Sequence, residues 1–162
     1  HCHIGISHHF DHLSELLQVM GDAESAPKIA KESVNYFHRG MKAHHQEEER
    51  ELFPAVLSSA ILGEEKTLVA HLIEKLTQEH RSLESAWKEL EHGLKEIIKG
   101  HANTLDHVHF KLLIKRYKAH ASSEETVFLP LAEKILGRNS NHMAALGLSL
   151  HMRHVPHIPS HI

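Results

Sequence analysis

The sequence has few of the residues that build cross-linked or membrane-spanning proteins. Cys2 is the one cysteine among 162 residues, so no intramolecular disulfide can form and a zinc-finger cage of thiolates is excluded. The longest apolar runs, such as 146–150, are far shorter than the roughly 20 residues with which a helix crosses a membrane. These absences predict a protein of the reducing cytoplasm without a membrane partner.

A long block of like charge is also missing. The chain has 18 basic and 21 acidic side chains and a formal net charge of -3, and no basic run is long enough to bind a polyanion. We therefore expect no nucleic-acid partner. Because the chain begins on His1, the sequence leaves open a segment upstream. A homodimer is possible as well.

Proline and glycine are sparse, with five and eight copies. Between them, apolar residues recur at a spacing of three and four, which is typical of helices, and the length fits a single domain. The punctuation predicts four helices, each followed by a glycine, at about 7–20, 28–62 with a kink at Pro54, 64–99 and 104–135.

One apolar face on each helix predicts an all-α fold, an antiparallel up-and-down four-helix bundle over residues 1–137. The stripe of the third helix consists of Ile73, Leu76, His80, Leu83, Trp87, Leu90, Leu94 and Ile97. The stripe of the fourth consists of Leu113, Tyr117, His120, Glu124, Val127 and Leu131. Residues 138–162 are expected to form a short helix at about 143–152 and an extended histidine-rich tail, which packs on the bundle or leaves it.

Histidine is abundant, with 20 copies, and its spacing indicates a repeat. Two His-x-x-x-Glu pairs interrupt the apolar stripes, and residues four apart share one face of a helix. Each pair leads into a proline through Leu-Phe or Phe-Leu. The same three residue types recur at an offset of 76 residues: His44, Glu48 and Pro54 match His120, Glu124 and Pro130. The chain therefore looks like a two-helix unit used twice.

The two remaining helices each place one histidine in the inward stripe. These are His80 in the third helix and His9 in the first. His8 and His12 are the alternatives to His9, because both lie within one turn of it. The expected cluster thus contains one histidine from each of these helices and a histidine and a glutamate from each of the other two.

A register shift of one residue would put His45 and Glu49 in the place of His44 and Glu48, but the matched repeat argues against it. Tyr117 lies one turn before the second pair, and we hypothesise that its hydroxyl donates to the cluster. The other histidines considered are expected at the surface or in the tail, at positions 101, 107, 109, 142, 151, 154, 157 and 161.

Four imidazoles and two carboxylates would then converge inside the bundle. Buried polar and charged groups are costly without partners, so such a cluster needs compensating charge, which a pair of cations supplies. Imidazole suits iron, zinc, copper and nickel, and bridging carboxylates that leave positions open are typical of non-haem iron. The ligand set resembles the di-iron carboxylate bundles in its logic but is richer in nitrogen.

Four segments carry a resemblance to the hemerythrin-like domains with the His-His-Glu cation-binding signature. They are HHFDHLSELL at 8–17, HHQEEERELFPAV at 44–56, QEHRSL at 78–83 and HASSEETVFLP at 120–130. The resemblance implies an oxo- or hydroxo-bridged di-iron centre, with manganese and zinc as alternative metals. Carried onto this chain, the ligands are His9, His44, Glu48, His80, His120 and Glu124.

The resemblance also implies a function, which is to bind or sense oxygen, nitric oxide or iron in stress response or iron-centre repair. A di-iron enzyme that activates dioxygen or peroxide, as a ferroxidase or peroxidase, is the alternative. Oxygen carriers of this family have a second histidine where this chain has Glu48, and another where it has Glu84 or Leu76. This departure argues against reversible oxygen transport.

Overall fold

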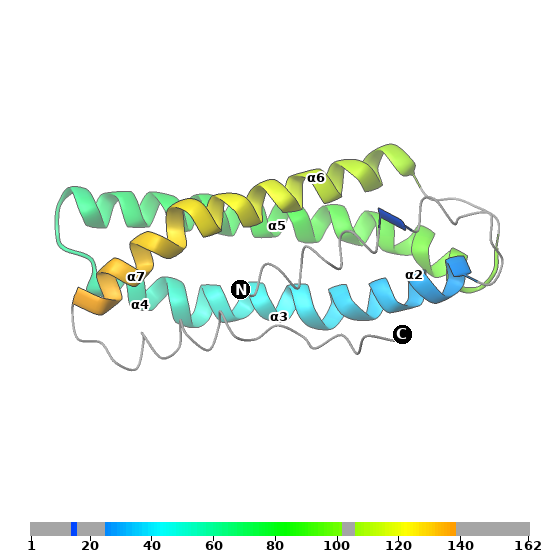
Figure 1. Cartoon of the computed structure of the whole chain (residues 1–162), viewed down its shortest axis with the longest axis horizontal. Coiled ribbons are helices and arrows are strands. Elements are labelled where there is room, and N and C mark those ends of the chain that lie inside the picture. The colour runs from blue at the N-terminus through cyan, green and yellow to red at the C-terminus, as the bar shows by residue number, and fades with distance from the viewer. Residues whose placement is uncertain (1–13, 16–24, 102–105, 139–162) are drawn as a thin grey trace.

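The computed structural model describes residues 14–15, 25–101 and 106–138, which form long helical rods (Figure 1). The first rod consists of α2 (Ser25–Tyr36), η1 (Phe37–Met41), α3 (Lys42–Glu47), η2 (Glu48–Leu52) and α4 (Phe53–Ser59). The second is α5 (Glu64–Ile98). The third consists of α6 (His107–Ser123), η3 (Glu124–Phe128) and α7 (Leu129–Arg138).

The rods pack side by side, with α2 and α4 against α5, α6 against α5, and α7 against α4 (Figure 1). The described residues contain no strand, so the all-α class is confirmed for this part of the chain. The helix expected at 7–20, the short helix at 143–152 and the tail lie almost wholly outside the described residues. The number of four helices therefore stays a prediction.

Helix ends follow the local sequence closely. Gly63, with φ 110, precedes α5, and two glutamates in the first turn of that helix favour its positive end. The Asp106 carboxylate accepts hydrogen bonds from two backbone N–H groups of the first turn of α6. Because Asp106 has an extended backbone, this helix begins at His107, and the predicted start at about 104 is wrong.

The predicted stop at Gly137 also needs correction, because α7 is described through Arg138. The Arg138 guanidinium donates to both carboxylate oxygens of Glu65, at 3.0 and 2.5 Å. This ion pair ties α7 to the first turn of α5 and favours continued helix past the glycine.

Three of the described helical turns are π-helical, and two of them, η2 and η3, occupy matching places in the repeat. The Phe53 N–H donates to the Glu48 carbonyl, and the Leu129 N–H donates to the Glu124 carbonyl, each five residues back. In both copies a proline lies two residues after the end of the π turn. Its ring would clash with the carbonyl four residues earlier in a regular helix, and the wider turn relieves this clash.

The π turn of the third rod changes which side chains face the core. Val127, expected in the inward stripe, is 48% exposed, whereas Phe128 is 1% exposed. A π turn holds one more residue than an α turn, so the inward position moves on by one residue. Leu131, also expected inward, is partly buried.

The apolar core consists of two clusters at the two ends of the rods. The tryptophan cluster surrounds Trp87, which stacks on Phe37 with ring centroids 4.2 Å apart. The phenylalanine cluster surrounds Phe53 and Phe128, whose rings meet edge to face at 5.1 Å. Each large apolar side chain buried in this way contributes about 1.5–3 kcal/mol. The stripe predicted for the third helix lies in these clusters, apart from His80 between them.

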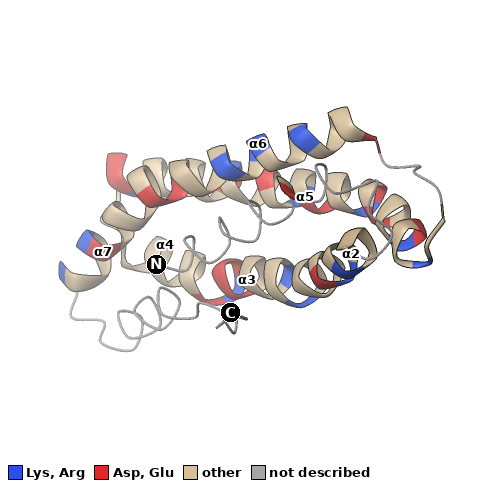
Figure 2. Cartoon of the chain, turned by 45° about the vertical axis from the view of Figure 1, so that its right-hand side comes forward, with Lys and Arg blue, Asp and Glu red and all other residues tan. Residues whose placement is uncertain are grey.

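Charged side chains occur along every rod (Figure 2). Among the charged residues of α6 there are only lysines and an arginine, whereas α5 carries both signs. Within the described ranges, none of the helices is both long and apolar enough to span a membrane. The cytoplasmic location stays a prediction.

Candidate metal centre

A layer of buried polar side chains separates the two apolar clusters. All its members are at most 7% exposed, and they come from α3, η2, α5, α6 and η3. The layer consists of His44, His45, Glu48, His80, His120 and Glu124.

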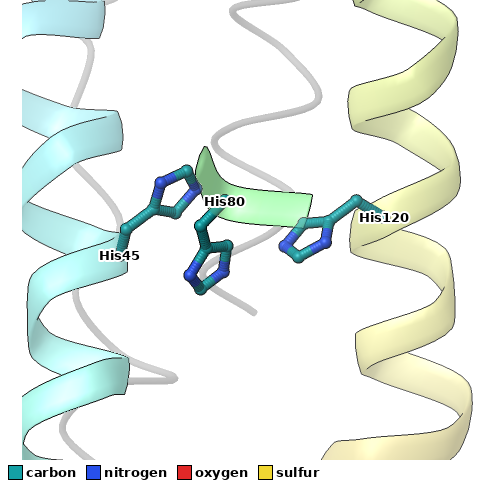
Figure 3. Close-up of side chains that lie close together, drawn as sticks. All are labelled: His45, His80 and His120. Atoms are coloured by element: carbon teal, nitrogen blue, oxygen red, sulfur yellow. The ribbon is translucent and has the colours of Figure 1, made fainter. Parts of the chain in front are cut away.

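Three imidazoles form one group within this layer. His45, His80 and His120 point toward one another from three helices (Figure 3), and one ring nitrogen of each lies within 4.8 Å of the others. The rings of His45 and His80 stack with centroids 3.8 Å apart and planes 9° apart. The ring of His120 meets that of His80 edge on, at 4.9 Å. This group offers only nitrogen to a cation.

His44, Glu48 and Glu124 form the second group, which is rich in oxygen; one ligand atom of each likewise lies within 4.8 Å of the others. The two Glu48 oxygens point in different directions. Oε1 lies 2.7 Å from His44 Nε2, and Oε2 lies 3.1 Å from Nε2 of His80 in the other group. Likewise, Glu124 Oε2 lies 3.3 Å from His120 Nε2. Both carboxylates therefore lie between the two groups, as bridging ligands do.

The repeat explains how these pairs are positioned. In each copy the histidine lies in the last turn of an α-helix, and the glutamate four residues later opens the π turn. One-turn spacing puts both side chains on the inner face. The proline that favours the π turn thereby also influences the direction of the carboxylate, and π turns inside helices occur often at functional sites.

Burial controls the charges of the layer. It raises the pKa of Glu124 well above the ordinary value, and the neighbouring Glu48 carboxylate raises it further. Burial also lowers the pKa of His45 to about 2, with a further decrease from His80. His45 is therefore neutral, which is the form that donates a lone pair to a metal. A cation between the carboxylates would supply the positive charge that two buried glutamates need.

Carboxylates from α5 hold the outer nitrogen of two of the imidazoles. His45 Nδ1 donates to Glu84 Oε1 at 3.0 Å, and His120 Nδ1 donates to Glu79 Oε2 at 2.7 Å. A hydrogen bond on Nδ1 fixes the tautomer and leaves the Nε2 lone pair for a metal, as in carboxylate–histidine–metal triads. The two rings are thus oriented as ligands would be.

Arg81 joins two outer carboxylates, that of Glu84 on α5 and that of Glu49 on η2. It donates to Glu84 Oε2 at 2.5 Å and also bonds to Glu49. Glu49 Oε2 in turn lies 3.7 Å from Nδ1 of His80. Three groups of alternating charge, Glu84, Arg81 and Glu49, therefore connect His45 to His80 on the outer side of the stacked rings.

A pocket of about 600 Å³ opens beside this layer, between α5 and α6. Glu79 and His120 line it together with the cationic side chains of Lys75 and Arg116. The pocket therefore reaches one histidine of the three-imidazole group and the carboxylate that orients it.

Five of the six residues expected as ligands are brought together in this layer: His44, Glu48, His80, His120 and Glu124. Their role as ligands stays a prediction. The sixth, His9, and its alternatives at positions 8 and 12 lie outside the described residues. Tyr117 is buried with its ring 6.1 Å from that of His120, and donation by its hydroxyl stays a hypothesis.

Sequence reasoning did not place His45 in the centre beside His44. The repeat favoured one histidine for each copy, yet both members of the doublet are buried. The doublet itself is the one signal that could have suggested this. Both adjacent side chains fit in the layer because they have different partners. His44 Nε2 lies 2.7 Å from Glu48 Oε1, and His45 Nδ1 lies 3.0 Å from Glu84 Oε1 on α5.

The donor set fits metal cations. Within the described part of the chain, His45 Nε2 and both ring nitrogens of His80 make no hydrogen bond, although buried polar atoms normally do. The imidazole nitrogens and the two carboxylates of the layer can together coordinate metal ions. The fold and the layer thus define an all-helical protein whose buried histidines and glutamates can hold a metal.

Comparison with known proteins gives the family. The model of the Hemerythrin HHE cation binding domain matches residues 1–132, so the chain belongs to this family and the resemblance is confirmed. An "Uncharacterized protein" of Haemophilus influenzae is 26% identical over 137 residues, which is 82% of this chain and 76% of that protein. No solved structure matches the chain significantly.

Proposed function

We propose that this hemerythrin-like protein holds two iron ions in its buried polar layer and uses them to bind or sense dioxygen or nitric oxide. Stress response and iron-centre repair are the roles that suit such a centre. The supporting observation is that Glu48 and Glu124 each lie between the two ligand groups. The proposed ligands are His9, His44, Glu48, His80, His120 and Glu124.

The donor chemistry favours iron over a hard cation such as magnesium, which prefers oxygen ligands alone. Iron, when bound, supplies reversible binding of small ligands and one-electron chemistry. The residues of the chain do the rest: the two apolar clusters exclude water on either side, and Glu79 and Glu84 orient two imidazoles. The pocket beside His120 gives a small ligand a route from solvent.

The test is to load the chain with ferrous iron under argon, remove excess metal and measure iron per chain and the optical spectrum before and after adding nitric oxide or oxygen. We expect about two irons per chain, as in di-iron bundles, and a lasting spectral change on adding the ligand. A protein that stays iron-free and colourless would contradict the proposal.

The enzyme alternative has one observation in its favour. Glu79 is 31% exposed, lines the pocket and accepts the hydrogen bond from His120 Nδ1. Such a carboxylate can relay protons between solvent and the centre, which a ferroxidase or peroxidase reaction needs. Rapid repeated oxidation of added ferrous iron, or consumption of peroxide, would favour the enzyme over a binding or sensing protein.

We also propose that residues 7–20 form the fourth helix of an antiparallel bundle and bring His9 to the centre. Replacing His9 with alanine is then expected to lower the iron content, whereas the same change at His8 or His12 leaves it unchanged. If the variant at position 12 alone lost iron, His12 would be the ligand instead.

A further inference from the structure

His45 is the position at which the repeat of this chain breaks inside the polar layer. The residue 76 positions later is Ala121, which is buried in the tryptophan cluster. His45 is fully buried, with an exposed fraction of 0%. One copy therefore contributes an imidazole where the other contributes a methyl group, and a buried polar side chain needs a physical reason.

A purely structural role, in which hydrogen bonds hold the side chain, would explain only one of the two ring nitrogens of His45. Glu84 accepts from Nδ1, but Nε2 makes no hydrogen bond within the described residues. A ring nitrogen of His45 lies within 4.8 Å of those of His80 and His120. The ring thus has the arrangement of a ligand, with a carboxylate on one nitrogen and the other nitrogen left for a cation.

We propose that His45 is a metal ligand, and that with His80 and His120 it forms a three-imidazole subsite, which holds one of the two ions of the proposed di-iron centre and binds zinc or copper in place of iron when these are offered. This inference rests on the proposed metal centre and deepens it, because it makes the two metal positions chemically unlike. The other subsite, formed by His44, Glu48 and Glu124, is rich in oxygen.

The difference in donors sets the preference. Nitrogen ligands favour zinc and copper, whereas carboxylates suit manganese and iron better. When both kinds of metal are present, zinc is therefore expected in the three-imidazole subsite and iron or manganese between the carboxylates. Since a metal lies in the plane of each imidazole it binds, the stacked rings of His45 and His80 must turn apart on binding.

The first experiment compares the wild type, His45→Asn and a matched control, His92→Asn, which changes an exposed histidine of α5. Zinc alone is titrated against a chromophoric chelator. We expect His45→Asn to weaken the tighter zinc site by at least about tenfold, since even outer partners of ligands contribute 10–100-fold. The control should bind as the wild type does.

The second experiment counts nitrogens directly. With less than one equivalent of Cu²⁺ as the probe, the hyperfine pattern in the electron paramagnetic resonance spectrum should indicate three imidazole nitrogens in the wild type. The pattern of His45→Asn should indicate two. Identical copper spectra and equal zinc affinities in both proteins would overturn the assignment of His45 while leaving the metal centre intact.

Folding is monitored by circular dichroism, because the substituted site is buried. If His45→Asn does not fold, Glu84→Gln tests the same idea from outside: it removes charge from the acceptor of His45 Nδ1 and should weaken zinc about tenfold. A folded Glu84→Gln with unchanged zinc affinity would contradict the inference. A wild type that binds no metal at all would instead contradict the proposed function itself.

Discussion

The two copies of the His-x-x-x-Glu-to-proline segment share a backbone but not an environment. Residues 44–54 and 120–130 both pass from an α turn to a π turn at the glutamate. Around them, the first copy adds His45 and contacts Glu84, whereas the second has Ala121 and contacts Glu79 beside the pocket. The residue types shared at matched positions thus accompany the same local geometry, and neighbouring elements make the two halves of the site unequal.

The largest effect is expected from replacing the two glutamates that occupy matching positions in both copies. Glu48→Gln and Glu124→Gln should each lower the metal content from about two ions per chain to one or none, because either change removes a shared negative ligand. Metal analysis after dialysis checks this.

Helix content should stay the same in both variants, and the unfolding temperature in excess chelator should be unchanged or higher. The reason is that burial already raises the pKa of Glu124, so removing the carboxylate relieves desolvation. Two retained ions in both variants would show that the ligand assignment is wrong.

Replacing the outer carboxylates should have the next largest effect. The two replacements should also differ from each other, because each carboxylate contacts a histidine of a different copy. Glu79→Gln and Glu84→Gln are each expected to weaken metal binding by about 10–100-fold, as losses of histidine partners do. Because Glu79 also lines the pocket, only its variant should in addition change the rate at which nitric oxide binds, measured by stopped flow. Equal rates in the two variants would argue against the pocket as the entry route.

The prolines test the shared backbone. Pro54→Ala and Pro130→Ala remove the ring clash that favours the π turn, so each carboxylate should be less well directed and iron affinity should fall by about tenfold, as losses of ligand orientation do. A crystal structure of either variant shows the turn directly. A π turn that persisted with unchanged affinity would mean that the metal layer, rather than proline, maintains it.

The smallest effect is expected at Glu65, which joins the ends of both copies. It accepts from the Ile61 N–H just after α4 and from Arg138 of α7. The Arg138 hydrogen bond, followed by that of Ile61, lowers the pKa of Glu65 from 4.5 to about 2.

A lowered folded pKa means that the stabilisation is complete above pH 4.5 and is lost as the pH falls toward 2. Urea unfolding between those pH values should therefore show a slightly smaller loss of stability in Glu65→Gln than in the wild type. Because the Glu65 side chain keeps partial contact with solvent, screening keeps the difference small. Parallel pH profiles of the two proteins would contradict this role.

The spacing of apolar residues and the caps determined the helices well. The third helix was predicted at 64–99 and is Glu64–Ile98, and its stripe is buried or partly buried as expected. The errors arise where a tertiary contact or an unusual turn changes a local rule. Val127 faces solvent because the π turn shifts the register, and α7 passes Gly137 to reach Glu65.

The sequence by itself determined the helical class, the family and the pairing of each histidine with a glutamate one turn on, because all three depend on residues close together in the chain. Only the tertiary structure decided that His45 joins the centre, that Glu84 and Glu79 orient different imidazoles, and that Glu48 lies between two ligand groups. Apart from the His44–Glu48 contact within one turn, these contacts join residues more than 30 positions apart, and their geometry follows from the packing of α5 against the other rods.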